Sequence, residues 1–526
     1  MSEAVGARTI AAVNPATGES LGSVPVVTRE QVQSAFHRAR QAQHAWGATP
    51  VAGRVRALRP LLELMIERRD ALALKISEET GKPRFEALIA EVIPTLDALD
   101  YCLRNAETLL QSEPVQHRLL RTTRSTLHYE PYGVVGVITP WNYPFFLTAS
   151  ISLSALFAGN AVLNKPSEFT PLVGLEFERL LRESGLPPAL YQCLPGYGAT
   201  GQALVEAGCN KISFTGSVAT GRKVAAACGE RLIPVSLELG GKDPAIVLAD
   251  ADLERAVKSL TWGAFTNCGQ VCASVERIFV QESIADGFTE RFVESVRGLR
   301  QGPDSAYDVD VGSMVNRLQF EKVNAQVEDA TSKGAQILIG GHGQAGEGDK
   351  ARYYYTPTVL TQVDESMNVE REETFGPVVT IVPVRDEEEA LQRANESPYG
   401  LTASVWTRSK EVAERLARGL HFGSVFVNDS LAPSGAGEVP WGGTKASGFG
   451  KSRGPQGLKE MSRIKHVSVD RFNLRDNPIW YPYSRDKYRL LSEFVPAMFG
   501  DSATRRVKAG IRGVRTGLRT FFGLGA

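Results

Sequence analysis

Residues 211–217, Lys-Ile-Ser-Phe-Thr-Gly-Ser, predict a short strand, a glycine turn and the start of a helix that runs through Cys228. Ser217 stands at the expected N-cap, where its hydroxyl satisfies a backbone N–H of the first turn. Gly216 lets the chain turn, and Gly221 lets the helix pack closely. Such a turn presents unpaired N–H groups and the positive end of a helix to a phosphate. The pattern is neither G-x-G-x-x-G nor a Walker A loop, and by itself such a turn is a plain connection at least as often as a phosphate site.

Outward from this turn, short β-branched segments alternate with helical patterns. Further strands are expected at Gly133 to Thr139, Ala161 to Lys165, Pro234 to Leu237 and Ala245 to Leu248. Alternation of buried strands with helices implies a parallel sheet covered on both faces. A second α/β stretch extends from about Leu253 to Val427. Ahead of the first strand, apolar residues at three- and four-residue spacing predict helices over Glu30 to Trp46, Ala52 to Gly81 and Arg84 to Gln111.

The length and composition limit the number of domains, the kinds of partner and the cellular setting. A chain of 526 residues is too long for one ordinary core, so two or three domains are expected. A net charge of zero gives no sign of a nucleic-acid partner. Six cysteines without C-x-x-C spacing, and only seven histidines, favour neither a disulfide framework nor a metal site, so a reducing, cytoplasmic setting is expected. The run Leu147 to Leu163 is too short and too polar to span a bilayer and predicts a buried helix.

The C-terminal tail differs from the rest of the chain. After Asp501 there is no acidic residue, while six basic residues follow. On a helix, one apolar face would carry Val507, Ile511, Val514, Leu518, Phe521 and Phe522. Gly510, Gly513 and Gly517 would each weaken an isolated helix by about 1 kcal/mol. The tail is therefore expected to order on an anionic membrane surface, to dock on the protein's own body, or to stay disordered.

Several polar residues stand where open α/β sheets bind ligands, just after a predicted strand. Lys165 and Glu168 follow the strand that begins at Ala161 and could reach ribose hydroxyls; alone, such a pair is more often only solvated. Glu238 also ends an apolar strand, beside two glycines, where partial burial would make it a base near neutral pH. Asn142, between Pro140 and Pro144, could donate to a developing oxyanion.

Two thiols lie in the stretch Phe265 to Cys272. A cysteine is most often a small buried apolar residue, but its thiolate is the best side-chain nucleophile at neutral pH. The nearby Glu238 and Asn142 patterns favour the chemical role for one of the two, Cys268 or Cys272.

Taken together, these segments resemble the aldehyde dehydrogenase superfamily from about residue 10 to 470. The ordered motifs are Pro140-Trp-Asn-Tyr-Pro144, Lys165-Pro-Ser-Glu168, Phe214-Thr-Gly-Ser217, Glu238-Leu-Gly-Gly-Lys242, Asn267 to Cys272, Glu372-Glu-Thr-Phe-Gly-Pro377 and Pro440-Trp-Gly-Gly-Thr-Lys445 with Ser447-Gly-Phe-Gly450. The resemblance implies an α/β fold with a Rossmann-like parallel-sheet cofactor domain, a second α/β catalytic domain and a small β oligomerisation element.

The resemblance also implies the roles of individual residues. Cys272, two residues after Gly-Gln, would be the nucleophile; Glu238 would activate water against a thioester; and Asn142, with the Cys272 N–H, would form the oxyanion hole. Glu373 and Phe375 would contact the ribose and nicotinamide, Lys165 and Glu168 the adenosine ribose, and Ser217 the pyrophosphate. The full set implied for cofactor binding is Thr139, Pro140, Trp141, Lys165, Ser167, Glu168, Gly216, Ser217, Leu239, Glu373 and Phe375.

The reaction implied is NAD(P)-dependent oxidation of an aldehyde to its carboxylic acid through a thiohemiacetal and a thioester. Glu238 favours hydrolysis over transfer to coenzyme A, and the Glu168 carboxylate favours NAD over NADP, although Lys165 could tolerate NADP. A non-enzymatic relative would not need Cys272, Glu238 and Asn142 together. A thiol hydrolase would use Cys272 but not the cofactor residues.

The expected substrate is an uncharged aliphatic or aromatic aldehyde, with succinate semialdehyde as the alternative. Relatives acting on succinate semialdehyde have an arginine where this chain has Ser150, and the loop Ser430 to Val439 has no basic residue. A carboxylate-bearing substrate would then lack a counter-charge, whereas Tyr143, Phe146, Leu147 and the loop predict an apolar tunnel.

The resemblance divides the chain as follows: a dinucleotide-binding domain at 1–112 and 134–240, a catalytic domain at 241–444, oligomerisation strands at 113–133 and 445–475, and an extension at 476–526. The segment Trp480-Tyr-Pro-Tyr-Ser484 is similar to class 3 and fatty-aldehyde members. Leu119 to Tyr132 and Ile464 to Phe472 resemble the strands of the family's oligomerisation sheet. A homo-oligomer, at least a dimer, is expected, with peripheral membrane contact through the tail as a further prediction.

Overall fold

The computed structural model describes residues 9–119, 122–304, 306–346, 352–473, 477 and 479–522, and of residues 518–522 only the backbone. The tail residues Leu518, Phe521 and Phe522, named above for an apolar face, therefore have side chains outside the described part. The chain divides into two compact units, one of Met1–Leu110 with Tyr129–Arg463 and one of Gln111–His128 with Ile464–Ala526.

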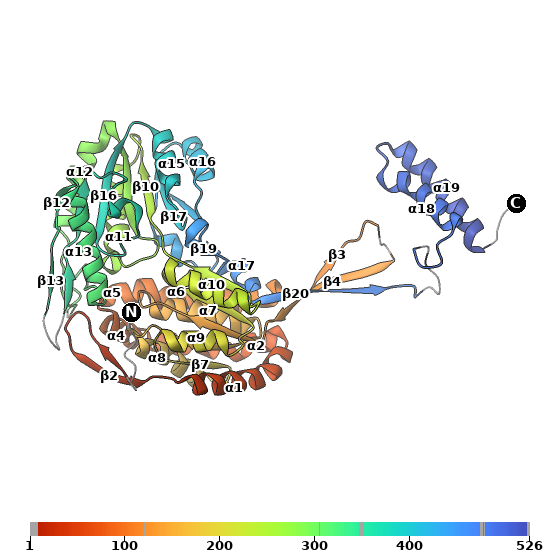
Figure 1. Cartoon of the computed structure of the whole chain (residues 1–526), viewed down its shortest axis with the longest axis horizontal. Coiled ribbons are helices and arrows are strands. Elements are labelled where there is room, and N and C mark those ends of the chain that lie inside the picture. Colours follow the sequence, from red (N-terminus) through yellow and green to blue (C-terminus); the bar gives the residue numbers. More distant parts are fainter. Residues whose placement is uncertain are drawn as a thin grey trace. The chain divides into compact units, whose positions relative to one another are not determined.

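The first sheet of the larger unit has the order β19-β9-β8-β5-β6-β7, parallel except for β19. Its strands are β5 (Val134–Ile138), β6 (Ala161–Lys165), β7 (Tyr191–Cys193), β8 (Lys211–Thr215), β9 (Val235–Glu238) and β19 (Gly448–Phe449). The four central strands β5, β6, β8 and β9 are buried almost throughout, as expected for a parallel sheet covered on both faces. Figure 1 shows α7, α8, α9 and α10 gathered around this sheet. These helices are α7 (Pro144–Phe157), α8 (Pro171–Glu183), α9 (Gly198–Glu206) and α10 (Val218–Glu230).

The N-terminal helices pack on this domain and are more broken than the periodicity predicts. After the hairpin β1 (Thr9–Val13) and β2 (Ser20–Pro25), they are α1 (Arg29–Ala48), α2 (Val51–Leu58), α3 (Pro60–Glu67), α4 (Arg69–Thr80), α5 (Arg84–Ala87), the π-helical turn η1 (Leu88–Val92) and α6 (Ile93–Leu109). The single stretch predicted from Ala52 to Gly81 was wrong. Pro60 starts a new helix because it lacks a backbone N–H, and Arg68 leaves helical geometry at φ −97°, ψ 8°.

The apolar run predicted as one buried helix from Leu147 to Leu163 is also divided. Helix α7 ends at Phe157, and Gly159, at φ +94°, reverses the chain into β6. Only residues without a Cβ adopt this conformation readily, so the glycine decides where the helix stops. No helix among the described residues is long and apolar enough to cross a membrane.

The second sheet has the order β12-β15-β16-β11-β10-β17-β18 and is parallel apart from β12. Its strands are β10 (Asp243–Val247), β11 (Val275–Gln281), β12 (Gln336–Ile339), β15 (Thr358–Thr361), β16 (Val378–Val384), β17 (Thr402–Trp406) and β18 (Ser424–Val427). The associated helices are α11 (Leu253–Phe265), α12 (Glu282–Arg297), α13 (Arg317–Ser332), α14 (Asn368–Arg371), α15 (Glu387–Glu396) and α16 (Lys410–Gly419). Short elements complete the unit: β13 (Gly343–Ala345), β14 (Tyr353–Tyr355), the 3₁₀ turns η2 (Thr266–Gly269), η4 (Ala432–Gly435) and η5 (Lys445–Ser447), and α17 (Gly454–Glu460).

Three apolar cores hold the larger unit together. One lies around the first sheet and one around the second. The third is small and consists of Tyr143, Phe146, Val271, Ala273, Leu401, Phe426, Leu431 and Trp441, with the partly buried Cys272 packed against it. Because its members come from both sheet domains, the third core marks where the two domains meet.

The smaller unit contains a three-stranded sheet and a helical hairpin. The sheet has the order β20-β4-β3, built from β3 (Glu113–Val115), β4 (Thr123–Pro131) and β20 (Ser462–Asp470). Helices α18 (Arg485–Phe499) and α19 (Ala503–Phe522) pack on each other. A Cβ at Gly513 would lie 2.9 Å from the Phe494 ring, so the tail glycines that weaken an isolated helix permit close packing here.

Candidate active site

The predicted cofactor residues gather at one edge of the first sheet. Thr139, Lys165, Gly216 and Leu239 follow, or end, the parallel neighbours β5, β6, β8 and β9 at their carboxyl ends. Ligands of open α/β sheets bind at this edge. The four motifs, scattered over a hundred residues of sequence, therefore come from adjacent strands.

The turn after β8 has the form expected of a phosphate cradle. Ser217 is the N-cap of α10, and its Oγ accepts from the Thr220 N–H at 3.3 Å. A Cβ at Gly221 would lie 2.6 Å from Leu239, so the glycine permits the helix to pack against the loop after β9. The first N–H groups of a helix have no intrahelical acceptor, so an anion can accept hydrogen bonds from them.

Lys165 and Glu168, both predicted to contact a ribose, form an ion pair with each other. Lys165 Nζ lies 3.3 Å from Glu168 Oε2, with the lysine side chain 8% and the glutamate 20% exposed. Burial lowers the pKa of Lys165, and the Glu168 charge opposes that change. Ser167 accepts from the Phe169 N–H at 3.3 Å and shapes the same turn.

A second group of predicted cofactor residues meets the first across the two domains. The Glu373 carboxylate accepts from the Gly241 N–H at 3.1 Å, and burial raises its pKa to about 7. The Phe375 ring meets Trp141 edge-on, with ring centroids 5.3 Å apart. A Cβ at Gly240 would lie 2.3 Å from Glu373, so a larger residue there would displace this carboxylate. The carboxyl ends of parallel strands, a helix N-terminus and two aromatic rings together fit a dinucleotide.

The two thiols of the Asn267 to Cys272 segment are in different surroundings. Cys268 is fully buried, whereas Cys272 is the one cysteine of the six, all in the described residues, that is not. Asn267 and Cys268 both have left-handed backbone geometry, at φ 50° and 56°, which is costly for residues other than glycine. Burial, then the charges of Asp243, Glu373 and Glu238, raise the pKa of Cys272.

Glu238, the last residue of β9, is a buried carboxylate whose oxygens can still accept hydrogen bonds. Among the described residues, neither of its oxygens has a hydrogen-bond partner, and its side chain is 6% exposed. Burial raises the pKa of Glu238 to about 8, against the opposing charges of Arg453 and Lys451. A carboxylate of this kind takes up and releases a proton near neutral pH.

Asn142 lies in the turn between β5 and α7, next to the small third core. It is 2% exposed, and its Oδ1 has no hydrogen-bond partner among the described residues. Its backbone carbonyl accepts from Lys82 Nζ and from Asn267 Nδ2, which joins this turn to the cysteine segment. The amide side chain is therefore carried on a turn that is fixed from two sides.

Several residues of this region were missed in the sequence. Arg453 is 6% exposed, with its guanidinium carbon 5.0 Å from the Phe146 ring centroid and 5.3 Å from that of Trp441. Its Nη1 donates to the Ser434 and Ala436 carbonyls at 2.5 and 3.2 Å. Lys82, Glu86, Glu91 and Glu276 were also missed. Lys82, Glu86 and Glu91 lie far along the chain from the motifs, whereas Glu276 is four residues after Cys272. No local pattern distinguishes any of the four from surface charges.

The expectation that a carboxylate-bearing substrate would lack a counter-charge rested on the loop and Ser150 alone and did not include Arg453. The loop Ser430 to Val439 indeed contains no basic residue, but α17 begins beside it and brings Arg453 against its backbone. Sequence distance hid a contact that only the packing of α17 creates.

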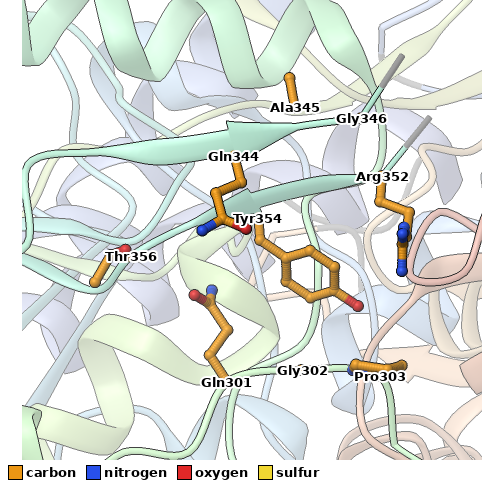
Figure 2. A pocket seen from close by; sticks show the side chains of 9 residues that line it. All are labelled: Gln301, Gly302, Pro303, Gln344, Ala345, Gly346, Arg352, Tyr354 and Thr356. Carbon is orange, nitrogen blue, oxygen red and sulfur yellow. The ribbon is translucent and has the colours of Figure 1, made fainter. Parts of the chain in front are cut away.

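Figure 2 shows a pocket of about 480 Å³ at a different place, bounded by Gln301, Tyr354 and Arg352. Its polar groups are engaged, since Gln301 Nε2 donates to the Tyr355 carbonyl and the Tyr354 hydroxyl to the Ala16 carbonyl, both at 2.8 Å. None of the predicted site residues lines it. The described residues also contain no cluster of three or more His, Cys, Asp or Glu side chains that could hold a metal ion.

Comparison with known proteins gives a consistent result. Residues 2–467 match the sequence pattern of a family described as the aldehyde dehydrogenase family. The chain is 42% identical over 468 residues, 89% of each chain, to a Mycobacterium ulcerans protein provisionally named succinate-semialdehyde dehydrogenase (NADP(+)) 2. It is 40% identical over 497 residues, 94% of this chain and 92% of the other, to the 4,4'-diapolycopene aldehyde oxidase of a Methylomonas species. The crystal structure of an NAD-dependent aldehyde dehydrogenase from Sinorhizobium meliloti superposes with a TM-score of 0.85 at 35% identity, covering 91% of this chain and 94% of that one.

Proposed function

The chain belongs to the aldehyde dehydrogenase family, and on that premise we propose that Cys272, Glu238 and Asn142 carry the NAD(P)-dependent oxidation of an aldehyde to its acid. The observation that carries the assignment comes from the part of the chain that the structure describes: the buried Glu238 carboxylate has no hydrogen-bond partner there and lies near Cys272, the one cysteine there that is not fully buried. Buried polar groups left unpaired are rare and concentrate at functional sites.

The residues act in sequence on one carbon atom. The Cys272 thiol gives its proton to Glu238, which releases it to solvent before the later hydrolysis. The thiolate sulfur bonds to the aldehyde carbon while the C=O electron pair moves to oxygen. The Asn142 amide and the Cys272 N–H donate to that oxyanion. Bound NAD(P) supplies the hydride acceptor that converts the adduct to a thioester. Glu238 then takes a proton from water, hydroxide bonds to the thioester carbon, and the Cys272 thiolate leaves with the acid released.

The cofactor lies along the edge built by β5, β6, β8 and β9 in this proposal. Ser217 and the α10 N-terminus would hold the pyrophosphate, the Lys165–Glu168 pair would contact the adenosine ribose, and Glu373 with Phe375 would contact the nicotinamide ribose and ring. Thr139, Pro140, Trp141, Ser167, Gly216 and Leu239 complete the walls.

The test is NAD(P)H formation over a panel of aldehydes, with Cys272→Ala beside Cys268→Ser. Loss of activity only in Cys272→Ala supports the assignment. Activity that survives Cys272→Ala, or that is lost equally in both variants, refutes Cys272 as the nucleophile.

For the substrate, we propose an uncharged aldehyde with an apolar body, because the third core surrounds Cys272 with Tyr143, Phe146, Phe426 and Trp441. Each buried methylene contributes about 0.8 kcal/mol, so kcat/KM is expected to rise roughly fourfold per methylene until the pocket is filled. The measurement is kcat/KM from propanal to decanal. A flat series contradicts an apolar pocket.

Arg453 favours a second candidate, a semialdehyde that carries a carboxylate. It is a buried cation against the same aromatic rings, close enough to Glu238 and Asp97 for their charges to act on it. The provisional name of the mycobacterial relative points the same way. The discriminating quantity is the ratio of kcat/KM for succinate semialdehyde over butanal, compared between the wild type and Arg453→Gln. A ratio above one that falls tenfold or more in the variant selects the charged substrate.

We also propose a homodimer as the minimum assembly, formed through β20. This strand is the edge of its sheet in the described chain, and Ile464 and Val469 are 64% and 56% exposed. An exposed edge pairs readily with another strand. Arg471 donates its N–H to the Thr122 carbonyl of the β4 side, so the alternate position His466 has its N–H on the free edge. Light scattering of the wild type and of His466→Pro, which removes that edge N–H, tests the pairing; equal masses for both refute it.

Membrane contact through α19 is a further part of the proposal. With its glycines toward α18, α19 leaves Val507, Ile511 and Val514 56% to 65% exposed, and no acidic residue follows Asp501. Such a helix suits an anionic lipid surface. Co-sedimentation with anionic but not zwitterionic vesicles, lost in Ile511→Asp, is expected. Binding that is absent from both vesicle types contradicts it.

A further inference from the structure

The turn that carries Asn142 rests on a fully buried ion pair that the reaction itself does not use. Lys82 Nζ lies 2.6 Å from Glu91 Oε1 and donates to the Asn142 carbonyl at 2.6 Å. Both charged side chains are completely buried, and Lys82 Nζ also lies 4.2 Å from the centroid of the Tyr143 ring. Lys82 thus contacts both Asn142 and the residue after it.

Glu91 holds the other end of the same turn. Its Oε2 accepts from the Phe145 and Phe146 N–H groups at 2.8 and 3.3 Å, in the first turn of α7. No side chain at the N-cap of α7 satisfies these groups, so Glu91 supplies the missing cap from a distant segment. Glu91 lies in the π-helical turn η1, an irregularity that is common at functional sites.

The segment that leads to Cys272 also hydrogen-bonds to the Asn142 carbonyl oxygen. Asn267 Nδ2 donates to the Asn142 carbonyl at 3.0 Å. The Asn267 N–H and the Thr266 hydroxyl donate to Glu86 at 2.9 and 2.6 Å, which holds Asn267 in its left-handed conformation. One carbonyl oxygen therefore joins Lys82 on one side to the chain leading to Cys272 on the other.

We propose that Lys82, Glu91 and Asn267 are positioning residues that set where the Asn142 amide lies relative to the Cys272 sulfur, an inference that rests on the proposed oxyanion role of Asn142. A buried ion pair is weak evidence for stability, because desolvating two charges offsets their attraction. An oxyanion donor, by contrast, acts only when it is held in place, and a misplacement of about 1 Å costs roughly 100-fold in rate. Precise placement therefore accounts for this pair better than stability does.

The experiment compares two variants that loosen the turn in different ways. Lys82→Met/Glu91→Gln removes both buried charges but keeps an oxygen to cap α7. Asn267→Gly keeps the left-handed backbone and the ion pair and removes only the Nδ2 donor. Lys75→Met, at a half-exposed lysine on α4 paired with Glu176, is the matched control. Each is made in the wild type and in Asn142→Ala, and rates are referred to active sites titrated by alkylation of Cys272.

The expected result is a tenfold to hundredfold fall in kcat per titrated site in both loosened variants. The KM values for aldehyde and cofactor should change less than twofold, and Lys75→Met should match the wild type. In Asn142→Ala the same changes should have no further effect, because they act through the side chain already removed. A full multiplicative loss in Asn142→Ala, or a loss confined to the titrated site count, overturns the inference and leaves a structural role. If Asn142→Ala alone keeps the wild-type kcat, the oxyanion role fails first, and the inference falls with it.

Discussion

Replacing Glu238 by Gln tests two expected consequences of burying this carboxylate: a folded chain that loses stability as the pH rises, and a general base that acts near pH 8. In the folded chain burial raises its pKa from the ordinary value of 4.5 to about 8. Below pH 4.5 the group is protonated in both the folded and the unfolded chain, and its ionisation does not affect stability. As the pH rises from 4.5 to about 8, the unfolded chain releases the proton first, so the stability of the wild type falls. Above pH 8 the loss is complete.

The size of this loss follows from the two pKa values. One pKa unit corresponds to about 1.4 kcal/mol, so the ionised carboxylate destabilises the folded wild type by about 5 kcal/mol. Gln cannot ionise and has a similar size. The free energy of unfolding of Glu238→Gln should therefore gain on that of the wild type by about 4 kcal/mol between pH 5 and pH 9.

The assay is equilibrium urea unfolding of both proteins at pH 5, 7 and 9, beside kcat from pH 6 to 10. The wild-type kcat should rise with pH to a midpoint near 8, since only the carboxylate accepts a proton from water. Glu238→Gln should lose this limb and about 10² to 10⁴ in kcat. If the difference in unfolding free energy between the two proteins does not change with pH, the pKa of Glu238 is not raised by burial. An intact limb in the variant would refute Glu238 as the base.

Four further predictions concern the cofactor site, the nucleophile and the tail. Gly240→Ala places a Cβ 2.3 Å from Glu373 and should raise the cofactor KM roughly tenfold; an unchanged KM would show that the carboxylate moves freely. Glu168→Gln removes the charge that repels a 2′-phosphate and should raise the NADP to NAD ratio of kcat/KM roughly tenfold, whereas a falling ratio contradicts this placement. Without cofactor, the rate of alkylation of Cys272 by iodoacetamide should increase up to pH 10, because burial and nearby carboxylates raise the thiol pKa. A rate that reaches a plateau near pH 8 would show that the thiol pKa is not raised. Gly513→Val should destabilise the α18–α19 hairpin by about 1–3 kcal/mol, read as faster amide exchange confined to these helices, and unaltered exchange would rule out the close packing.

The strands and the phosphate-type turn could be predicted from the sequence because their signals are local. The strand expected at Ala161 to Lys165 is β6 to the residue, and β9 is displaced by one residue from the expected Pro234 to Leu237. Buried parallel strands are short apolar runs ended by polar residues, and an N-cap serine is read from its neighbours alone. Helix ends were less predictable where Pro60 and Gly159 compete with an unbroken apolar periodicity.

By itself, the sequence determined the family, the α/β class and the residue types available for the chemistry, since these depend on ordered local motifs. Only the tertiary structure decided which groups share a site and what their proton affinities are. Lys82 and Asn142 are 60 residues apart, and Arg453 lies beside a loop that precedes its own helix. The pKa of Glu238 depends on how much water the packed domains exclude and on which charges remain near it. Burial and long-range contact are properties of the folded chain, and no stretch of sequence carries them alone.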